Sequence, residues 1–275
     1  MTTEKVIEIC AERNIKAEVC PVYKNNVSVT GIMLGDGPVK ATIYPEKIET
    51  MEQLDKLLDL ANNPECPDYS SIIKDFDTAK KLLRIRVVSI NNKEYLKGKV
   101  FRQTNDYALI PYILLPSEGD VASEGDVASA CVTKSILSNW KVTEAEVFDA
   151  AEKNESSDFV VESFVDYLSR FYDLPMPDAD IPLFIVGNKR AFLGAGALFG
   201  SISVCENVAD RIKENSFYIL PSSIHEAIVL PETDDFSPRT MLSMVKEINA
   251  NEIKPEERLS DSVYLYKNGT ISQVA

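Results

Sequence analysis

His225 is the only histidine among the 275 residues, and Glu226 follows it directly. An imidazole that titrates near neutral pH can act as a general base, and a neighbouring carboxylate can orient it. Ser222 and Cys131 are candidate nucleophiles for such a base, although neither lies in the glycine-rich elbow that exposes a nucleophile. The candidate catalytic residues are Ser223, His225 and Glu226. The alternative is that the histidine is a hydrogen-bonded structural residue.

The elements around this segment are two apolar runs, Phe217–Leu220 and Ala227–Leu230, which are rich in β-branched and aromatic residues. Pro221 and Pro231 bound the runs, and this composition is typical of β-strands. We expect two paired strands, or one strand with a bulge, with His225 in the connection.

A second candidate site is a carboxylate-rich surface on predicted helices. Thr143 and Glu146 have the spacing of a capping box, which predicts a helix over Glu144–Lys153, and a further helix is predicted over Asp158–Tyr172. The predicted binding residues are Glu144, Glu146, Glu152, Glu155, Asp158 and Glu162. The alternative is an ordinary solvated helix face.

The charge of the chain supports this surface as a binding site. The net charge is −14 and the pI is near 4.7, which disfavours nucleic acid and anionic lipid, since both are polyanions, and favours a basic partner. The stretch from Glu144 to Asp180 has eleven acidic and two basic residues. The stretch from Lys74 to Arg102 has nine basic and three acidic residues. Most of the excess negative charge therefore belongs to one helical region.

The cysteines predict neither a disulfide framework nor a metal site. Five cysteines are scattered along the chain, no CxxC pair occurs, and one histidine is available, so the spacing of a zinc site is missing. The N-terminus has no signal-peptide apolar region, and the longest apolar run, Ala108–Pro116, is too short to span a bilayer. We therefore expect a cytoplasmic protein with reduced thiols and without a membrane segment, metal or cofactor.

Two glycine-bearing segments could be interpreted as ligand-binding loops, one for a dinucleotide and one for calcium. Gly194, Gly196 and Gly200 resemble a dinucleotide loop, but the spacing is GxGxxxG and the expected strand ends several residues earlier, so Ala191–Phe199 is interpreted as a hairpin strand. The unit SEGDVA occurs twice over Ser117–Ala128 and predicts a lengthened exposed loop. Its carboxylates lack the spacing of an EF-hand calcium loop.

Helices and hairpins alternate along the chain without a repeated βαβ rhythm. This pattern predicts an α+β fold with mixed, mostly antiparallel sheets. The Asn268-Gly269 turn between two alternating runs is the strongest hairpin signal. The expected organisation is an N-terminal subdomain (1–116), an acidic repeat loop (117–129) and a C-terminal subdomain (130–275), with Asp173–Asp180 as an alternative boundary.

Four segments carry a resemblance to a known family: VTKSILSNWKVTEAEVFDAAEKNE, NKRAFLGAGALFG, FYILPSSIHEAIVLPE and MVKEINANEIKPEERLSDSVYLYKNG. From about Val19 onward the chain resembles a domain-of-unknown-function family of clostridial-type bacterial proteins, and its final strand–helix–hairpin layout is more distantly similar to YtpQ-like proteins. The resemblance implies a fold and a bacterial or mobile-element origin rather than a reaction. Ser223, His225 and Glu226 match its most specific segment, whereas the SEGDVA duplication departs from it.

Three functional hypotheses follow. The first is a non-enzymatic interaction protein whose acidic helical face binds a basic protein surface, and a narrower version is an inhibitor that presents carboxylates where nucleic-acid phosphates would lie. The second is a small-molecule hydrolase or transferase that uses His225. The third is an adaptor with neither property.

Overall fold

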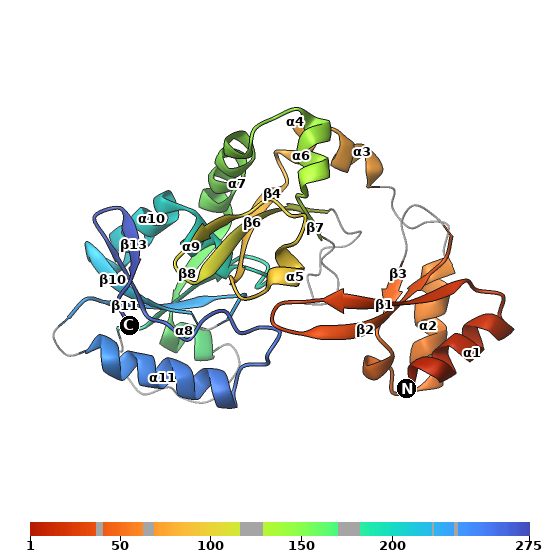
Figure 1. Cartoon of the computed structure of the whole chain (residues 1–275). Helices are drawn as coiled ribbons and strands as arrows, with labels where there is room; N and C mark the ends of the chain where they lie inside the picture. Colours follow the sequence, from red (N-terminus) through yellow and green to blue (C-terminus); the bar gives the residue numbers. More distant parts are fainter. Residues whose placement is uncertain (37–40, 63–68, 116–128, 170–181, 222, 234–235) are drawn as a thin grey trace. The chain divides into compact units, whose positions relative to one another are not determined.

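The polypeptide folds into two units, unit 1 (Met1–Ser71) and unit 2 (Ile72–Ala275). The computed structural model describes residues 1–36, 41–62, 69–115, 129–169, 182–221, 223–233 and 236–275 (Figure 1). Helices and antiparallel sheets occur in both units, which confirms the predicted α+β class. The chain passes from unit 1 to unit 2 within α3 (Ser70–Lys74).

Unit 1 is built on a three-stranded antiparallel sheet in the order β1–β2–β3. Its elements are α1 (Thr3–Glu12), β1 (Ala17–Tyr23), β2 (Ser28–Leu34), β3 (Ala41–Ile43), the 3₁₀ helix η1 (Pro45–Lys47) and α2 (Met51–Asn62). Apolar residues at helical spacing on α1 and α2 meet the alternate residues of the sheet, so the unit has its own core. The buried residues are Val6, Ile9, Cys10, Ile32, Leu34, Ile43, Ile48, Leu54 and Leu58.

Unit 2 contains a four-stranded sheet in which β6 is central. β6 pairs with β4 on one side and with both β5 and β7 on the other, and every pair is antiparallel. The elements of this part are α4 (Phe76–Ala79), β4 (Leu83–Ser89), α5 (Lys93–Leu96), β5 (Arg102–Thr104), β6 (Tyr107–Leu114), β7 (Ser129–Cys131) and α6 (Lys134–Trp140). β6 is buried along nearly its whole length, as expected for a strand with neighbours on both sides.

A second, six-stranded antiparallel sheet of unit 2 has the order β13–β12–β10–β11–β9–β8. Its strands are β8 (Phe159–Ser163), β9 (Phe184–Asn188), β10 (Ser216–Leu220), β11 (Ala227–Pro231), β12 (Tyr264–Lys267) and β13 (Thr270–Gln273). The predicted pairing of β10 with β11 is confirmed, and so is the hairpin at Asn268-Gly269. The loop that carries His225 therefore connects two central strands.

The helices of unit 2 bury the faces of these sheets (Figure 1). They are α7 (Glu144–Asp158), α8 (Phe164–Ser169), α9 (Ala195–Gly200), α10 (Ile202–Ile212) and α11 (Pro238–Asn251). α9 contacts both β4 and β9 and so lies between the two sheets, while α7 packs on β4. α11 covers the opposite face of the six-stranded sheet, where Met241 and Val245 pack on Tyr218, Leu220 and Leu230.

Asp106, in the turn between β5 and β6, joins the two parts of unit 2. Its carboxylate accepts hydrogen bonds from Ser260 Oγ (2.7 Å) and Ser262 Oγ (2.9 Å), and also from the Tyr264 hydroxyl. A carboxylate with three hydroxyl donors is well satisfied when it is removed from water. The C-terminal segment is thereby fixed to a turn more than 150 residues earlier.

Two predicted elements are wrong. The helix expected over Asp158–Tyr172 is a strand, β8, followed by the short helix α8 over its described part. The hairpin strand expected over Ala191–Phe199 is instead a loop followed by α9. In both places short-range patterns do not reveal the long-range partner, which is β9 for β8 and β4 for α9.

The chain divides into its two units after Ser71, earlier in the sequence than either boundary considered above. β6 and β7, which precede and follow the SEGDVA repeat, pair in one sheet. The repeat itself and the Asp173–Asp180 segment lie outside the described residues.

Candidate functional site

The loop between β10 and β11 holds the three candidate catalytic residues. Ser223 is buried, and its hydroxyl accepts hydrogen bonds from the backbone N–H groups of His225 (2.9 Å) and Glu226 (3.2 Å). The same hydroxyl donates to the Glu226 carboxylate at 3.3 Å. This is the pattern by which a serine stabilises a turn. The Ser223 side chain therefore serves the conformation of its own loop.

The imidazole of His225 contacts the loop between β9 and α9. Its Nδ1 atom accepts a hydrogen bond from the backbone N–H of Leu193 at 3.2 Å, and its ring lies 5.9 Å from the ring of Phe192 between centroids. Leu193 has a positive φ of 53°, and Gly194 follows with the His225 carbonyl so close that a Cβ would lie 2.6 Å from it. His225 thereby connects the β10–β11 loop with the loop between β9 and α9, as expected for a structural histidine.

The predicted nucleophiles do not complete a catalytic arrangement in the described part of the chain. Cys131 lies on β7 in the four-stranded sheet, where its sulfur is 3.6 Å from the Tyr95 hydroxyl. Ser222 lies outside the described residues. Ser223, His225 and Glu226 are neighbours, but the hydrogen bonds of the imidazole and the hydroxyl run to backbone groups and to Glu226.

The predicted acidic residues fall into an exposed group and a buried group. Glu144 and Glu146 are exposed in the first turn of α7, and the predicted capping box is confirmed: the Thr143 side chain accepts from the Glu146 N–H, and the Glu146 carboxylate accepts from the Thr143 N–H. Hydrogen bonds from the Thr143 backbone and hydroxyl lower the pKa of Glu146. Glu152 is partly buried, and its Oε1 atom lies 3.2 Å from Nη1 of Arg102 on β5.

Glu155 and Asp158 are not on the exposed helix face that the sequence predicted. Both are buried, with exposed fractions of 2% and 6%. Glu155 accepts a hydrogen bond from the backbone N–H of Ile85 at 2.7 Å, and burial raises the pKa of its carboxyl to about 7. Removal from water is unfavourable for a charged carboxylate unless a partner compensates, so this side chain belongs to the packing of α7 on β4.

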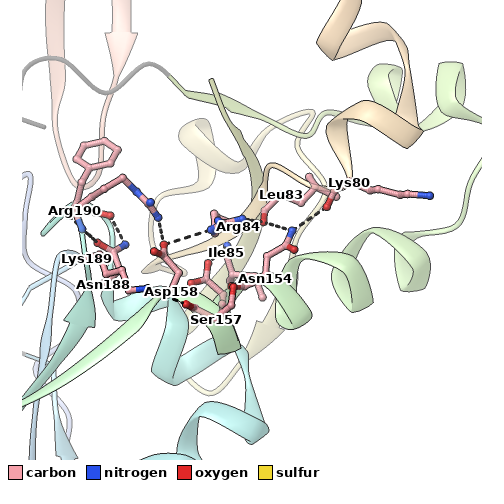
Figure 2. A network of polar contacts seen from close by, with 12 residues as sticks. Lys80, Leu83, Arg84, Ile85, Asn154, Ser157, Asp158, Asn188, Lys189 and Arg190 are labelled. Atoms are coloured by element: carbon pink, nitrogen blue, oxygen red, sulfur yellow. Dashed lines mark hydrogen bonds and ion pairs between the residues drawn. The ribbon is translucent and has the colours of Figure 1, made fainter. Parts of the chain in front are cut away.

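Asp158, the last residue of α7, lies between two guanidinium groups (Figure 2). One is Arg84 of β4 at 3.5 Å, and the other is Arg190 of the loop after β9. Asn154, one turn earlier, donates to the carbonyls of Lys80 (2.8 Å) and Leu83 (2.9 Å). These contacts join α7 to the start of β4 and to the loop after β9, where Arg190 lies.

The last predicted acidic residue, Glu162, lies on β8 at one edge of the six-stranded sheet, rather than on a helix. Two residues of the acidic stretch pair with residues of the basic stretch, because Asp158 lies beside Arg84 and Glu152 lies beside Arg102. The opposite charges of the two stretches were the signal in the sequence for this packing.

Sequence reasoning missed an apolar cavity of about 350 Å³ between α11 and the sheet face that it covers. Its lining includes Phe164, Leu183, Leu220, Ile228, Met244 and Ile248. Asn249 is the polar side chain among the described lining residues, and its amide donates to Ser260 O (2.9 Å) and Asp261 Oδ1 (2.8 Å). Met244 and Ile248 are 51% and 39% exposed, so the cavity has an apolar rim.

The glycines of the GxGxxxG pattern serve close packing. A Cβ on Gly196 would lie 1.8 Å from the carbonyl oxygen of Ile85, and a Cβ on Gly200 would lie 2.8 Å from the Ile85 side chain. α9 can approach β4 because these positions lack side chains. The element that these glycines allow to pack closely is a helix, not the hairpin strand expected from the sequence.

The described residues contain neither a metal-binding cluster nor a membrane-spanning helix. Within the described ranges, no three His, Cys, Asp or Glu side chains are grouped so that they could hold a metal ion. The helices of the same ranges are all too short or too polar to cross a bilayer.

Comparison with known proteins gives one match. A family model described as a family of unknown function, DUF5688, matches residues 2–268, in agreement with the predicted resemblance to a domain of unknown function. The chain matches no curated protein and no solved structure. Because the family match covers nearly the whole sequence, the chain belongs to the DUF5688 family, a family of unknown function.

Proposed function

We propose that this chain is a non-enzymatic interaction protein that binds a segment of a partner protein carrying an apolar side chain beside basic residues. The observation that carries the proposal is the apolar cavity under α11, with its exposed rim of Met244 and Ile248. Exposed apolar side chains around a cavity are typical of binding sites. A side chain of the partner would fill the cavity.

The acidic charge of the chain supports a basic partner. Glu247 is three residues after Met244, so helical periodicity places its carboxylate near one border of the cavity, and Glu252 directly follows the last residue of α11. Both are exposed. Among the basic residues of α11, Lys246 is three residues before the lining residue Asn249, so the same periodicity places it near the other border of the cavity. The net charge of −14 adds long-range attraction for a basic segment.

In the narrower version of the hypothesis, exposed carboxylates mimic the phosphates of a nucleic acid. Fewer carboxylates are exposed on α7 than the sequence predicted. Glu155 and Asp158 are buried, whereas Glu144, Glu146 and Asp149 are exposed on α7. Charge reversal of these three residues separates this version from binding at the cavity. If the partner is a nucleic-acid-binding protein, a DNA duplex should compete with this chain for it.

The expected setting is the cytoplasm of a bacterium, in keeping with the sequence resemblance to clostridial-type and, more distantly, YtpQ-like proteins. A hydrolase or transferase that uses Ser223, His225 and Glu226 is not proposed, because the hydroxyl and Nδ1 of these residues are engaged in the hydrogen bonds of their loops. The adaptor hypothesis differs from the proposal because an adaptor would need neither the cavity nor the exposed carboxylates to bind its partners.

The test is affinity capture from a bacterial lysate with two matched variants. Ile248→Asp places a charge at the rim of the cavity, and Ile202→Asp makes the same change at a similarly exposed residue on α10 (43%). We expect a partner that binds wild type and Ile202→Asp, binds Ile248→Asp at least about tenfold more weakly, and is released by salt. Equal capture by all three proteins, or binding that is unchanged by salt, would contradict the proposal.

A further inference from the structure

The cavity under α11 has one polar side chain in its described lining, that of Asn249. This residue lies in the last turn of α11 and is 3% exposed. Its amide donates both hydrogens, to Ser260 O at 2.9 Å and to Asp261 Oδ1 at 2.8 Å. A carbonyl oxygen and a carboxylate oxygen only accept hydrogen bonds, so the atom beside them is the amide nitrogen, and the orientation of the amide is fixed.

The carbonyl oxygen of the same side chain, Oδ1, is left as an acceptor. No hydrogen bond to it forms within the described ranges, where the Asn249 side chain takes part as a donor. The polar side-chain atoms of these ranges that are both shut off from solvent and without a partner are Nε of Arg86 and Nε of Arg190. Oδ1 therefore remains accessible, and because the rest of Asn249 is buried, the cavity is the space that it can reach. An acceptor in an apolar enclosure favours an occupant that brings one donor.

The size and lining of the cavity suit a large aromatic ring. An engineered cavity of ~150 Å³ in another protein holds benzene, so about 350 Å³ has room for a bicyclic ring system. Phe164, Phe236, Met241 and Met244 line the cavity, and both ring edges and thioether sulfurs make favourable contacts with aromatic rings. The described lining contains no charged side chain, so a charged occupant would lose its hydration without compensation.

We infer that the partner side chain that fills the cavity is tryptophan, and that its indole N–H donates to Oδ1 of Asn249. This inference rests on the binding function proposed above and names the side chain that binds. An indole N–H is a donor only, so one hydrogen bond satisfies it, whereas the hydroxyl of a tyrosine would carry acceptor lone pairs into an apolar lining. A leucine or phenylalanine would cover Oδ1 without giving it a donor, which is unfavourable for a polar atom removed from water.

The test titrates the full chain with three blocked peptides that have lysine on both sides of a central residue. That residue is tryptophan, tyrosine, or 3-benzothienylalanine, in which sulfur replaces the indole N–H. The readout is the NMR shift of isotope-labelled methionine methyl groups: Met241 and Met244 line the cavity, and Met51 on α2 is the reference. We expect the tryptophan peptide to shift Met241 and Met244 but not Met51, and to bind roughly tenfold more tightly than either of the other peptides.

Two variants check the place of binding. Ile228→Phe fills part of the cavity from β11 and should weaken binding of the tryptophan peptide at least about tenfold, whereas Ile202→Phe, the same change on α10, should match wild type. Equal affinity for the tryptophan and benzothienyl peptides, with Met241 and Met244 shifted, overturns the assignment of tryptophan and leaves the proposed function standing. If none of the peptides shifts either methionine, both the assignment and binding of a basic, apolar segment at the cavity are wrong.

Discussion

At the scale of single residues, Glu155 illustrates how one residue type serves opposite purposes within one helix. Glu144 and Glu146 are exposed at the start of α7, whereas Glu155 is buried against β4. The sequence spacing separates the buried glutamate from the exposed ones. Val147, Ala151 and Glu155 follow one another at intervals of four residues and share the buried face of α7. A carboxylate on an apolar stripe is thus better interpreted as a packing residue than as part of an acidic surface.

The raised pKa of Glu155, about 7, predicts how stability depends on pH. Between the ordinary value of about 4.5 and 7, the folded state retains a proton that the unfolded state loses, so the free energy of unfolding falls as pH rises through this window. Below the window both states are protonated, and the contribution of this group to stability is at its maximum. Glu155→Gln should remove this fall, which is on the order of 2–3 kcal/mol.

Urea denaturation at pH 5, 6, 7 and 8 measures this effect for wild type and Glu155→Gln. Glu144→Gln is the matched control, since it makes the same change at an exposed residue of the same helix. An equal loss of stability between pH 5 and pH 8 in wild type and Glu155→Gln would show that Glu155 does not cause it.

At the scale of elements, the sequence predicted those that depend on local signals and missed those that depend on distant partners. The capping box of α7 and the Asn268-Gly269 hairpin are local signals, and both are confirmed. β8 continues directly from α7 and becomes a strand because it pairs with β9, which is more than twenty residues later. No property of residues 159–163 specifies that partner, so the helix predicted there is wrong.

α9 shows the same dependence on a distant partner, and Gly196→Ala tests it. Alanine favours a helix over glycine by about 1 kcal/mol, which would stabilise α9 in isolation. In the protein the new Cβ would overlap the Ile85 carbonyl oxygen, and since backbone atoms cannot move aside as a side chain can, we expect a net loss of at least about 3 kcal/mol.

The control for this variant is Gly187→Ala, where the nearest described atom, the His225 carbonyl oxygen, would be 3.5 Å from the new Cβ. This is ordinary van der Waals contact, so the change in the free energy of unfolding should stay within about 1 kcal/mol. Chemical denaturation of both variants gives the comparison. Similar stability of the two alanine variants would mean that α9 moves away from β4 with little cost.

At the scale of the whole molecule, the two units have separate hydrophobic cores, and each should respond to its own core substitutions. Leu54 on α2 and Leu198 on α9 are both fully buried, one in each unit. Replacement of either leucine by alanine should destabilise its own unit by about 2–5 kcal/mol. Differential scanning calorimetry should therefore show two transitions, each lowered by one of the two variants. If both variants lower one shared transition, the units unfold cooperatively.

The charge pattern has a related explanation at this scale. The sequence separates an acidic stretch from a basic stretch, and composition cannot reveal whether opposite charges meet within one molecule or between two. In unit 2 the pairs of Arg84 with Asp158 and of Arg102 with Glu152 form within the chain. Other carboxylates, such as Glu144 on α7 and Glu247 on α11, are exposed on the surface.

The contact of Asp106 with Ser260, Ser262 and Tyr264 has a consequence for the order of events during synthesis. The three hydroxyl donors are translated long after the carboxylate that accepts from them, and β12, which carries Tyr264, is needed to complete the six-stranded sheet. Unit 2 therefore stays incompletely folded until its C-terminal strands have been synthesised. The core residues of unit 1 all belong to the first 71 residues, so unit 1 can fold earlier. A nascent chain stalled before residue 260 should contain a folded first unit beside a second that is still open to chaperones.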